Sequence, residues 1–290
     1  MKHLVFIINP RSGVDRQKQI QRAIDECLDL NQYTYELKFT EYARHGTELA
    51  RNAATGGAFA VVAVGGDGSV NDIVKGLLHT GTALAIIPKG SGNGMARTLN
   101  IPLNEREAIE VINRQQMTAM DIGFANGEPF VSNAGVAFDA VIAREFAASS
   151  RRGLAVYSYL VTKFMWMYQE KDWDIDIDGK KLKEQAFIIN VANGRQFGYN
   201  FKIAPGASWT DGLFDIVVVR KFPKVLGGFM ALRLLRGSIT SSAYVQHYHG
   251  RTVTIAHPEL DLIQLDGDPH SCEGSVTFNL ISGLQPVIVP

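Results

Sequence analysis

The sequence is poor in cysteine, has no excess of either charge and contains no long apolar run. Its two cysteines, Cys27 and Cys272, lack the spacing of a metal-binding or redox motif, so we expect two reduced thiols. Basic and acidic residues number 29 each, which argues against nucleic acid as a partner. No window approaches the roughly 18 apolar residues that a membrane-spanning helix needs. The short apolar run near the N-terminus is followed by a turn and not by a cleavage site, so we expect a cytoplasmic protein.

At 290 residues, 46% of them hydrophobic, the chain is long for one domain and can bury a sizeable core. The first part alternates short apolar runs with helical patterns. Strand-like runs lie at 3–9, 33–39, 59–64 and 83–88. Strands separated by helices of this length predict βαβ units and a parallel sheet covered on both faces.

After about Ile122 the pattern changes to short strand-like runs bounded by Gly, Asn, Asp or Pro. Helical stretches interrupt these runs only at 139–169 and 223–236. This pattern is typical of an antiparallel sandwich or barrel. We therefore predict an α/β domain at 1–122 and a mainly antiparallel β domain at 123–290, with the final residues able to pack back on the first domain.

Three turns rich in glycine or polar residues follow strands of the predicted parallel sheet. They are NPRSG (9–13), GGDGS (65–69) and PKGSGNG (88–94). Ligands of open parallel sheets bind beyond the carboxyl ends of the strands. Glycine lets the backbone approach an anion, and the amides of the turn and the following helix then point at it. The three turns predict a phosphate-binding edge.

Asp67 is the unusual member of these turns, because a carboxylate beside a phosphate repels it. Two interpretations are open: a cation such as Mg²⁺ lies between the two, or the carboxylate holds the loop through backbone N–H groups. The pattern GxxxxGK[ST] is absent, and no GxGxxG opens the first helix. A P-loop NTPase and a dinucleotide-binding Rossmann domain are therefore not expected.

The order of these motifs resembles that of the diacylglycerol kinase catalytic-domain family, which includes bacterial lipid kinases and is related to the sphingosine and ceramide kinases. The resemblance continues in order through MDIG, SNAGVAFDA, VANG, SWTDGLFDIVVV and LDGDP. It implies a Rossmann-like α/β nucleotide domain of the NAD-kinase and phosphofructokinase kind, joined to a β-sandwich domain for the lipid substrate.

The resemblance also implies which residues contact the nucleotide, ATP. Thr40 looks like the adenosine-contacting threonine of the family, and Ser91 stands where many members have threonine. The full set comprises Asn9, Pro10, Arg11, Ser12, Gly13, Thr40, Gly65, Gly66, Asp67, Gly68, Ser69, Val70, Asn71, Gly90, Ser91 and Asn93.

Two magnesium sites follow from the same resemblance. Asp211 matches the position that binds a structural Mg²⁺ in bacterial members, with the carbonyls of Ser208 and Leu213 as further ligands. A catalytic Mg²⁺ would be held by the nucleotide and, through water, by Asp67 and Asp121.

The LDGDP turn departs from the family, which usually has D-G-E at this position. The terminal carboxylate of that motif looks like the base for the lipid hydroxyl, and here it is Asp268, one methylene shorter. Either Asp268 or Asp266 would be the base, since a base must lie within hydrogen-bond reach of the hydroxyl. The segment is also an ordinary hairpin turn by sequence.

We therefore expect an ATP-dependent lipid kinase that transfers the γ-phosphate to a hydroxyl of a lipid such as diacylglycerol, a related phospholipid or a sphingoid base. One alternative is an NAD kinase-like or other small-molecule kinase, because those enzymes also carry GGDG at a strand end. The other is a catalytically silent nucleotide- or lipid-binding homologue, supported by the shortened DGD. The sequence leaves the acceptor and the oligomeric state open.

Two apolar stretches and a histidine pair remain. The segment 225–239 places Arg233 and Arg236 beside apolar residues, which suits peripheral contact with the inner face of a membrane as well as an ordinary surface helix. The aromatic segment 163–169 is expected to be core, with a lipid-binding wall as the alternative. His247 and His249 point the same way along a strand, but no third metal ligand has recognisable spacing, so we expect a solvated strand face.

Overall fold

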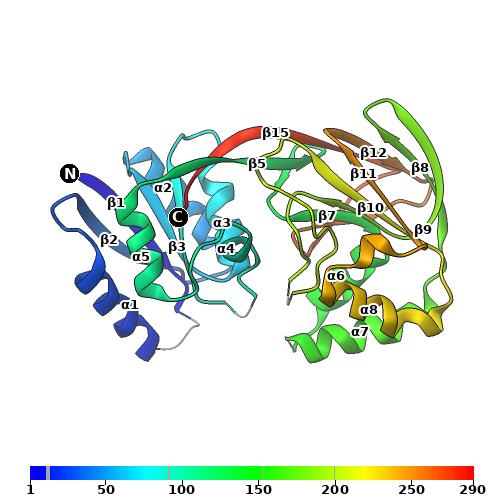
Figure 1. Cartoon of the computed structure of the whole chain (residues 1–290), viewed down its shortest axis with the longest axis horizontal. Coiled ribbons are helices and arrows are strands. Elements are labelled where there is room, and N and C mark those ends of the chain that lie inside the picture. The colour runs from blue at the N-terminus through cyan, green and yellow to red at the C-terminus, as the bar shows by residue number, and fades with distance from the viewer. Residues whose placement is uncertain (11–13, 91, 152, 199) are drawn as a thin grey trace. The chain divides into compact units, whose positions relative to one another are not determined.

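The computed structural model describes residues 1–10, 14–90, 92–151, 153–198 and 200–290. The chain forms two compact units, labelled by element in Figure 1. Unit 1 contains Met1–Asp121 and Ser282–Pro290, and unit 2 contains Ile122–Ile281. Among the described residues, no helix is both long and apolar enough to cross a bilayer.

Unit 1 is built on a parallel sheet with the strand order β15-β4-β3-β1-β2, in which only the end of β15 takes part. Its strands are β1 (Lys2–Ile8), β2 (Tyr33–Phe39), β3 (Ala60–Gly65) and β4 (Ala83–Pro88). Its helices are α1 (Val14–Cys27), α2 (His45–Thr55), α3 (Asp67–Leu77), α4 (Gly94–Thr98) and α5 (Glu105–Arg114).

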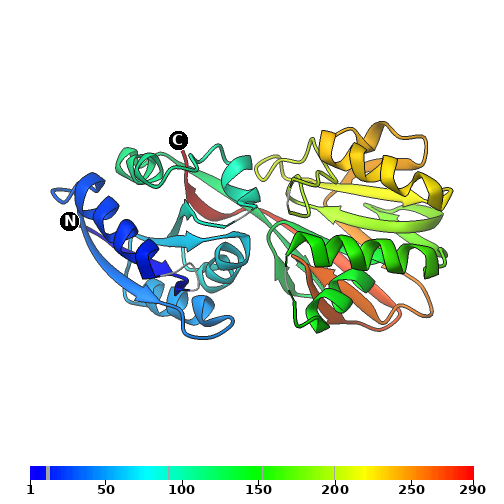
Figure 2. The ribbon, with the colours of Figure 1, turned by 90° about the horizontal axis from the view of Figure 1, so that it is seen from below.

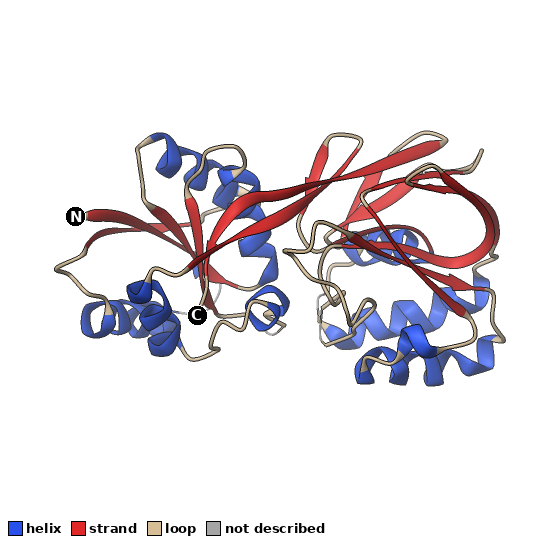
Figure 3. Cartoon of the chain, turned by 45° about the horizontal axis from the view of Figure 1, so that its top comes forward, coloured by secondary structure: helices blue, strands red, loops and turns tan. Residues whose placement is uncertain are grey.

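The central strands of unit 1 are apolar along almost their whole length because both faces of the sheet are covered. Every residue of β3 and of β4 is buried. Helices α1 and α5 pack together on one face and α2 and α3 on the other, as Figures 1 and 3 show. Local sequence also defines helix ends: the Asn104 side chain accepts the N–H groups of Arg106 and Glu107 and so begins α5. The predicted doubly covered parallel sheet is confirmed.

Unit 2 is mainly antiparallel. The strand β5 (Met117–Ala125) enters it from unit 1 and β15 (Ser275–Ile288) leaves it for unit 1. The remaining strands are β6 (Glu128–Phe130), β7 (Asn133–Ala137), β8 (Lys171–Ile177), β9 (Lys180–Ala192), β10 (Phe214–Arg220), β11 (Val245–Gly250), β12 (Thr252–Ala256), β13 (Leu262–Leu265) and β14 (Asp268–Ser271). The helices are α6 (Phe138–Ala148), α7 (Leu154–Met167), η2 (Lys224–Leu226), α8 (Gly227–Arg236) and η3 (Ile239–Ser241).

Two hydrophobic cores stabilise unit 2, and β10 contributes to both by the period-two alternation of a strand. Phe214, Ile216 and Val218 face the core between the strands. Val217 and Val219 face the second core, which α6, α7 and α8 cover. Figure 2 shows these three helices together on unit 2. The two-sided burial of β10 explains its nearly continuous apolar sequence, FDIVVVR.

The expectation that the aromatic segment 163–169 is core is wrong for part of it. Phe164 and Met165 pack against the second core, but α7 contains no fully buried residue. Trp166 and Met167 are 60% and 67% exposed. The helix is apolar on more than one face, and only one face packs on the sheet.

Candidate functional site

The carboxyl ends of the central strands of unit 1 lie at one edge of the sheet. The strand register pairs Ile8 with Val64 and Gly65 with Pro88, so the three turns that follow start side by side. The N–H of Asn9 donates to the carbonyl of Val64 at 3.4 Å. Arg11, Ser12, Gly13 and Ser91 lie outside the described residues, so the structure places only the remaining members of these turns.

Glycines pack the second and third turns against each other. A Cβ atom at Gly90 would lie 2.5 Å from the Cα of Gly66, and one at Gly65 would lie 2.5 Å from Ser69 Oγ. A Cβ atom at Gly68 would meet no atom within 4 Å. Close packing therefore accounts for glycine at positions 65, 66 and 90. Gly68 instead faces open space in the first turn of α3, where the backbone N–H groups of a helix attract anions.

Asp67 connects the same two turns. It is the first residue of α3, and its Oδ1 accepts the N–H of Met95, in the first turn of α4, at 3.1 Å. The sequence left two roles open for this carboxylate, binding a cation or holding the loop through backbone N–H groups. The structure shows a backbone N–H contact of the second kind. Its role toward a cation stays a prediction.

Asn93 closes the third turn through a reciprocal pair of hydrogen bonds. Its Oδ1 accepts the N–H of Gly90 and its Nδ2 donates to the carbonyl of Gly90, both at 2.8 Å. Asn93 has a φ of 51°, in the left-handed region that asparagine tolerates better than most residues. The predicted residue Asn93 thus shapes the turn through its side chain.

A pocket of about 130 Å³ lies beside these turns in unit 1. Of the predicted nucleotide residues, it is lined by Asn9, Pro10, Thr40 and Ser69. Thr40 is held there because its N–H donates to the carbonyl of Ile8 at 3.0 Å. Val70 is buried in α3, and Asn71 lies on the same helix outside the pocket lining.

Sequence reasoning missed part of the pocket wall. Tyr42 and Arg44, from the loop after β2, line it together with Asp72 of α3. The Tyr42 ring stacks on His45 with centroids 4.3 Å apart. The signal that would have found this loop is its position, since it follows the carboxyl end of a strand of the parallel sheet.

Asp121, near the end of unit 1, is buried, and its Oδ1 accepts the N–H of Gly283 at 2.8 Å. This bond ties β5 to the returning C-terminal segment. The structure therefore gives Asp121 a role in joining two segments of unit 1, and its predicted water-mediated contact with Mg²⁺ stays a prediction.

The motifs of unit 2 meet at residues 131–133. The Val131 carbonyl accepts Asn193 Nδ2 at 2.8 Å and Trp209 Nε1 at 3.0 Å. The Ser132 carbonyl accepts the N–H of Gly194. The sequences SNAGVAFDA, VANG and SWTDG are thus brought together, although the first lies more than 50 residues before the other two along the chain.

The two aspartates of the LDGDP turn have different surroundings. The Asp266 carboxylate accepts the backbone N–H groups of Val131, Ser132 and Asn133 at 2.9, 2.7 and 3.2 Å. Asp268, the first residue of β14, is exposed, and its carboxylate has no hydrogen bond among the described contacts. These three N–H donors occupy both oxygens of the Asp266 carboxylate. Asp266 therefore holds the turn, and Asp268 is the accessible carboxylate.

A buried polar network supports this turn from below. Gln264 Oε1 accepts the N–H of Gly267 at 2.8 Å, and Gln264 Nε2 donates to Asn133 Oδ1 at 3.0 Å and to Asp139 Oδ2 at 3.3 Å. Burial raises the pKa of Asp139 from 3.8 to about 7, although hydrogen bonds from Gln264 and Asn190 oppose the shift. Asp139 lies in the SNAGVAFDA motif, but the sequence alone indicated no role for it.

The predicted structural magnesium residues lie together on one loop of unit 2. Asp211 is exposed, and its Oδ1 accepts the N–H of Leu213 at 3.1 Å. Ser208 Oγ lies 3.2 Å from Thr210 Oγ1. The loop is thus turned around the Asp211 carboxylate, and cation binding by Ser208, Asp211 and Leu213 stays a prediction.

Comparison with known families assigns both units. The model of the diacylglycerol kinase catalytic domain matches residues 3–125, and that of the YegS C-terminal NAD kinase beta sandwich-like domain matches residues 132–284. A YegS-like protein of Chromohalobacter salexigens, named a probable lipid kinase, is 30% identical over 91% of this chain and 86% of its own. The chain belongs to the family of diacylglycerol kinases and YegS-like lipid kinases.

Other relatives agree with this assignment. A diacylglycerol kinase of Bacillus subtilis is 26% identical over 92% of this chain and 90% of its own. The crystal structure of a diacylglycerol kinase from Bacillus anthracis has a TM-score of 0.76 at 20% identity, covering 100% of this chain and 97% of that one. An NAD kinase from Archaeoglobus fulgidus, solved with ATP, has a TM-score of 0.55 at 13% identity over 99% of this chain and 93% of that one. These two structures establish the kinase-like fold, including the β-sandwich.

Proposed function

We propose that the protein is an ATP-dependent lipid kinase that phosphorylates a hydroxyl group of diacylglycerol or a related lipid. The observation that carries this proposal is the packing of the GGDG and PKGSGNG turns at the carboxyl edge of the sheet, in a chain of this family. The names of the relatives support a lipid acceptor over NAD.

On the donor side, we assign ATP to the edge formed by the three turns and the pocket beside them. Backbone N–H groups at the start of α3 would hold phosphate oxygens, and Gly68 leaves space for their approach. Thr40 and Tyr42 line the pocket, where they would contact the nucleoside. Phosphoryl transfer depends mostly on such positioning and on neutralising charge.

A magnesium ion bound with ATP would supply that neutralisation, and the carboxylates differ in how well they fit it. Asp67 is half-buried at the rim, and only its Oδ1 has a partner among the described contacts, which leaves Oδ2 for a water ligand. Asp121 fits less well, because it is buried and bonded to Gly283. Asp211, with carbonyls of Ser208 and Leu213, would hold the structural ion, since Mg²⁺ prefers oxygen ligands.

On the acceptor side, we assign Asp268 as the base that takes the proton of the lipid hydroxyl. Asp266 is committed to three backbone N–H groups, whereas Asp268 is exposed. A positioned base contributes about 10² to 10⁴ in rate. The shorter side chain of aspartate moves the carboxylate one methylene away from where glutamate would hold it.

We further propose that α7 and α8 contact the surface of the membrane that holds the lipid. Large apolar side chains on and between them are exposed: Leu154, Tyr159, Trp166, Met167, Val225, Phe229, Leu232 and Leu235. The charged residues of α7, η2 and α8 are all basic: Lys163, Arg233 and Arg236, together with Lys224, which is largely buried and ion-paired with Glu170. An apolar surface with basic residues suits an anionic bilayer, so the protein would be peripheral at the inner face of the membrane.

Transfer of label from ATP tests the function. The protein is incubated with Mg²⁺, labelled ATP and, separately, diacylglycerol, phosphatidylglycerol, sphingosine, an isoprenoid alcohol, NAD and a sugar phosphate. Label in a lipid supports the proposal. Label in NAD or the sugar phosphate would replace it with another kinase activity, and no transfer to any acceptor would favour a silent homologue. Asp172→Asn, at an exposed position on β8, is the matched control for Asp268→Asn.

A further inference from the structure

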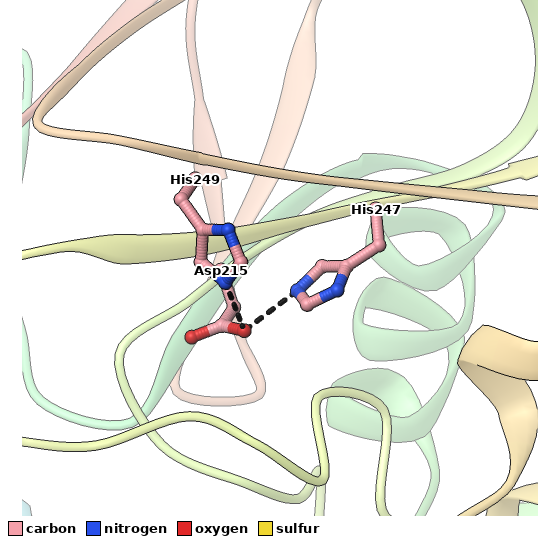
Figure 4. Close-up of side chains that lie close together, drawn as sticks. All are labelled: Asp215, His247 and His249. Atoms are coloured by element: carbon pink, nitrogen blue, oxygen red, sulfur yellow. Dashed lines mark hydrogen bonds and ion pairs between the residues drawn. The ribbon is translucent and has the colours of Figure 1, made fainter.

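Asp215, His247 and His249 form a cluster in unit 2 that the kinase proposal does not use. Figure 4 shows both imidazole rings directed at one carboxylate. His247 Nε2 lies 2.6 Å and His249 Nε2 3.4 Å from the same oxygen, Asp215 Oδ1. Among the residues that the structure describes, this is the one group of three side chains whose possible metal-ligand atoms all lie within 4.8 Å of one another.

Strand register creates the cluster. In the antiparallel pair of β10 and β11, Asp215 lies opposite His249, and Val217 lies opposite His247. The histidines are two residues apart and therefore share a face, and Asp215 points to that face from the neighbouring strand. The third ligand that the spacing of the histidines did not reveal is thus supplied by a residue 32 positions earlier.

The same face changes character along the two strands. Val217, Val219 and Val245 belong to the core that the helices cover. Beyond them the face carries Asp215, which is buried, and the histidines, which are 26% and 54% exposed. The carboxylate therefore lies at the base of the cluster, and the imidazoles form its solvent side. A metal ion would have access from solvent and a fixed ligand beneath it.

The cluster differs from a simple pair of side chains because three possible metal-ligand atoms lie within 4.8 Å of one another. Both imidazole nitrogens approach the same oxygen, Asp215 Oδ1, so all three side chains are directed at one another. Imidazole nitrogen favours zinc and neighbouring transition metals, and Mg²⁺ favours oxygen alone. Two histidines and a carboxylate, with a fourth position open to water, are a known ligand set of zinc.

We propose that Asp215, His247 and His249 bind one divalent transition-metal ion, of which Zn²⁺ is the best fit. The ion would join β11 to β10 at the end of the pair that the helices leave uncovered. Among the described strands, β10 is the only pairing partner of β11, so such a link would hold an edge strand in place. The proposal is independent of the kinase activity and of the magnesium residues on the loop before β10.

Zinc binding is measured on chelator-treated full-length protein by competition with a fluorescent zinc indicator, with excess Mg²⁺ present. We expect one Zn²⁺ per chain and an affinity lowered at least about 100-fold in His249→Gln and in His247→Gln, because even the loss of a supporting residue costs 10- to 100-fold. The control is His3→Gln, since His3 bonds to Thr34 in unit 1. Its affinity is expected to equal that of the wild type.

Cobalt spectroscopy provides a second measurement that depends on the ligands and not on activity. Co²⁺ in the wild type is expected to show the intense visible absorption of a four-coordinate ion, and this absorption is expected to disappear in the double variant His247→Gln/His249→Gln. Both histidines are at least partly exposed, so these variants should fold, which circular dichroism checks. If the double variant binds Zn²⁺ as tightly as the wild type, or if its Co²⁺ spectrum is unchanged, the proposal is overturned.

Discussion

The buried acid Asp139 leads to a prediction about how stability depends on pH. Its carboxylate accepts the N–H of Ala140 at 3.0 Å and lies in the network that supports the LDGDP turn. Burial raises its pKa from 3.8 to about 7 in the folded protein. The folded state thus holds the proton more tightly than the unfolded state, so this group contributes stability that is complete below about pH 4 and is lost as the pH rises through 7.

The magnitude follows from the two pKa values. A difference from 3.8 to about 7 corresponds to about 4 kcal/mol in total. Of this, about 2–3 kcal/mol is lost between about pH 5 and pH 8, because the interval from pH 5 to about 7 lies between the two pKa values. The variant Asp139→Asn cannot ionise and lacks this dependence. Replacing a carboxylate oxygen by an amide group beside Gln264 Nε2 also lowers the stability of the variant, but by the same free energy at every pH. This constant loss cancels when the two pH values are compared.

Urea unfolding followed by tryptophan fluorescence measures this effect in the right unit, because Trp166, Trp173 and Trp209 are the three tryptophans of the chain and all lie in unit 2. The free energy of unfolding of Asp139→Asn relative to the wild type should rise by about 2–3 kcal/mol from about pH 5 to pH 8. Other titrating groups affect both proteins equally. A relative stability that stays constant with pH would refute the argument, since Asp139 would then have an ordinary pKa.

Further predictions concern the proposed kinase site. Asp266→Ala should destabilise unit 2 by about 3 kcal/mol or more in urea unfolding, because three N–H groups lose their acceptor. Asp268→Asn should unfold like the wild type, but its rate of phosphoryl transfer should fall at least about 100-fold. Gly90→Ala should cost about 1–3 kcal/mol of stability through contact with the opposing turn. Gly68→Ala should leave thermal stability unchanged and weaken ATP binding measured by calorimetry; unchanged ATP affinity would remove this position from the nucleotide site. The thermal stabilisation by Mg²⁺ should disappear in Asp211→Asn, and its persistence would contradict the structural magnesium site.

Much of unit 1 could be predicted from the sequence, because short local patterns of apolar and glycine residues indicate its strands and turns. The run ALAIIP becomes β4 with the expected bounds, and YTYELKF becomes β2. Parallel strands also bring their following turns to one edge without further information. The contribution of Tyr42 and Arg44 to the pocket was missed, because their loop carries no glycine signal.

In unit 2, the surroundings of the candidate site residues depend on contacts between segments that are distant in the sequence. The sequence left Asp268, at the motif position, and Asp266 as its alternative both open as the base. The approach of the backbone at 131–133 gives Asp266 three N–H partners, and this contact is the basis for proposing Asp268. Similarly, the composition of 163–169 predicted burial, and the exposure of Trp166 was decided by which face of α7 packs on the sheet.

The sequence by itself determined the alternation of elements in unit 1 and the glycine-rich turns at one edge of its sheet, since each depends on neighbours within a few residues. The tertiary structure decided which acids are held by backbone amides and which histidines acquire a third ligand. Asp215 meets His247 and His249 through the register of two strands, and register depends on the packing of whole faces. Such pairings leave no mark in the spacing of the residues along the chain.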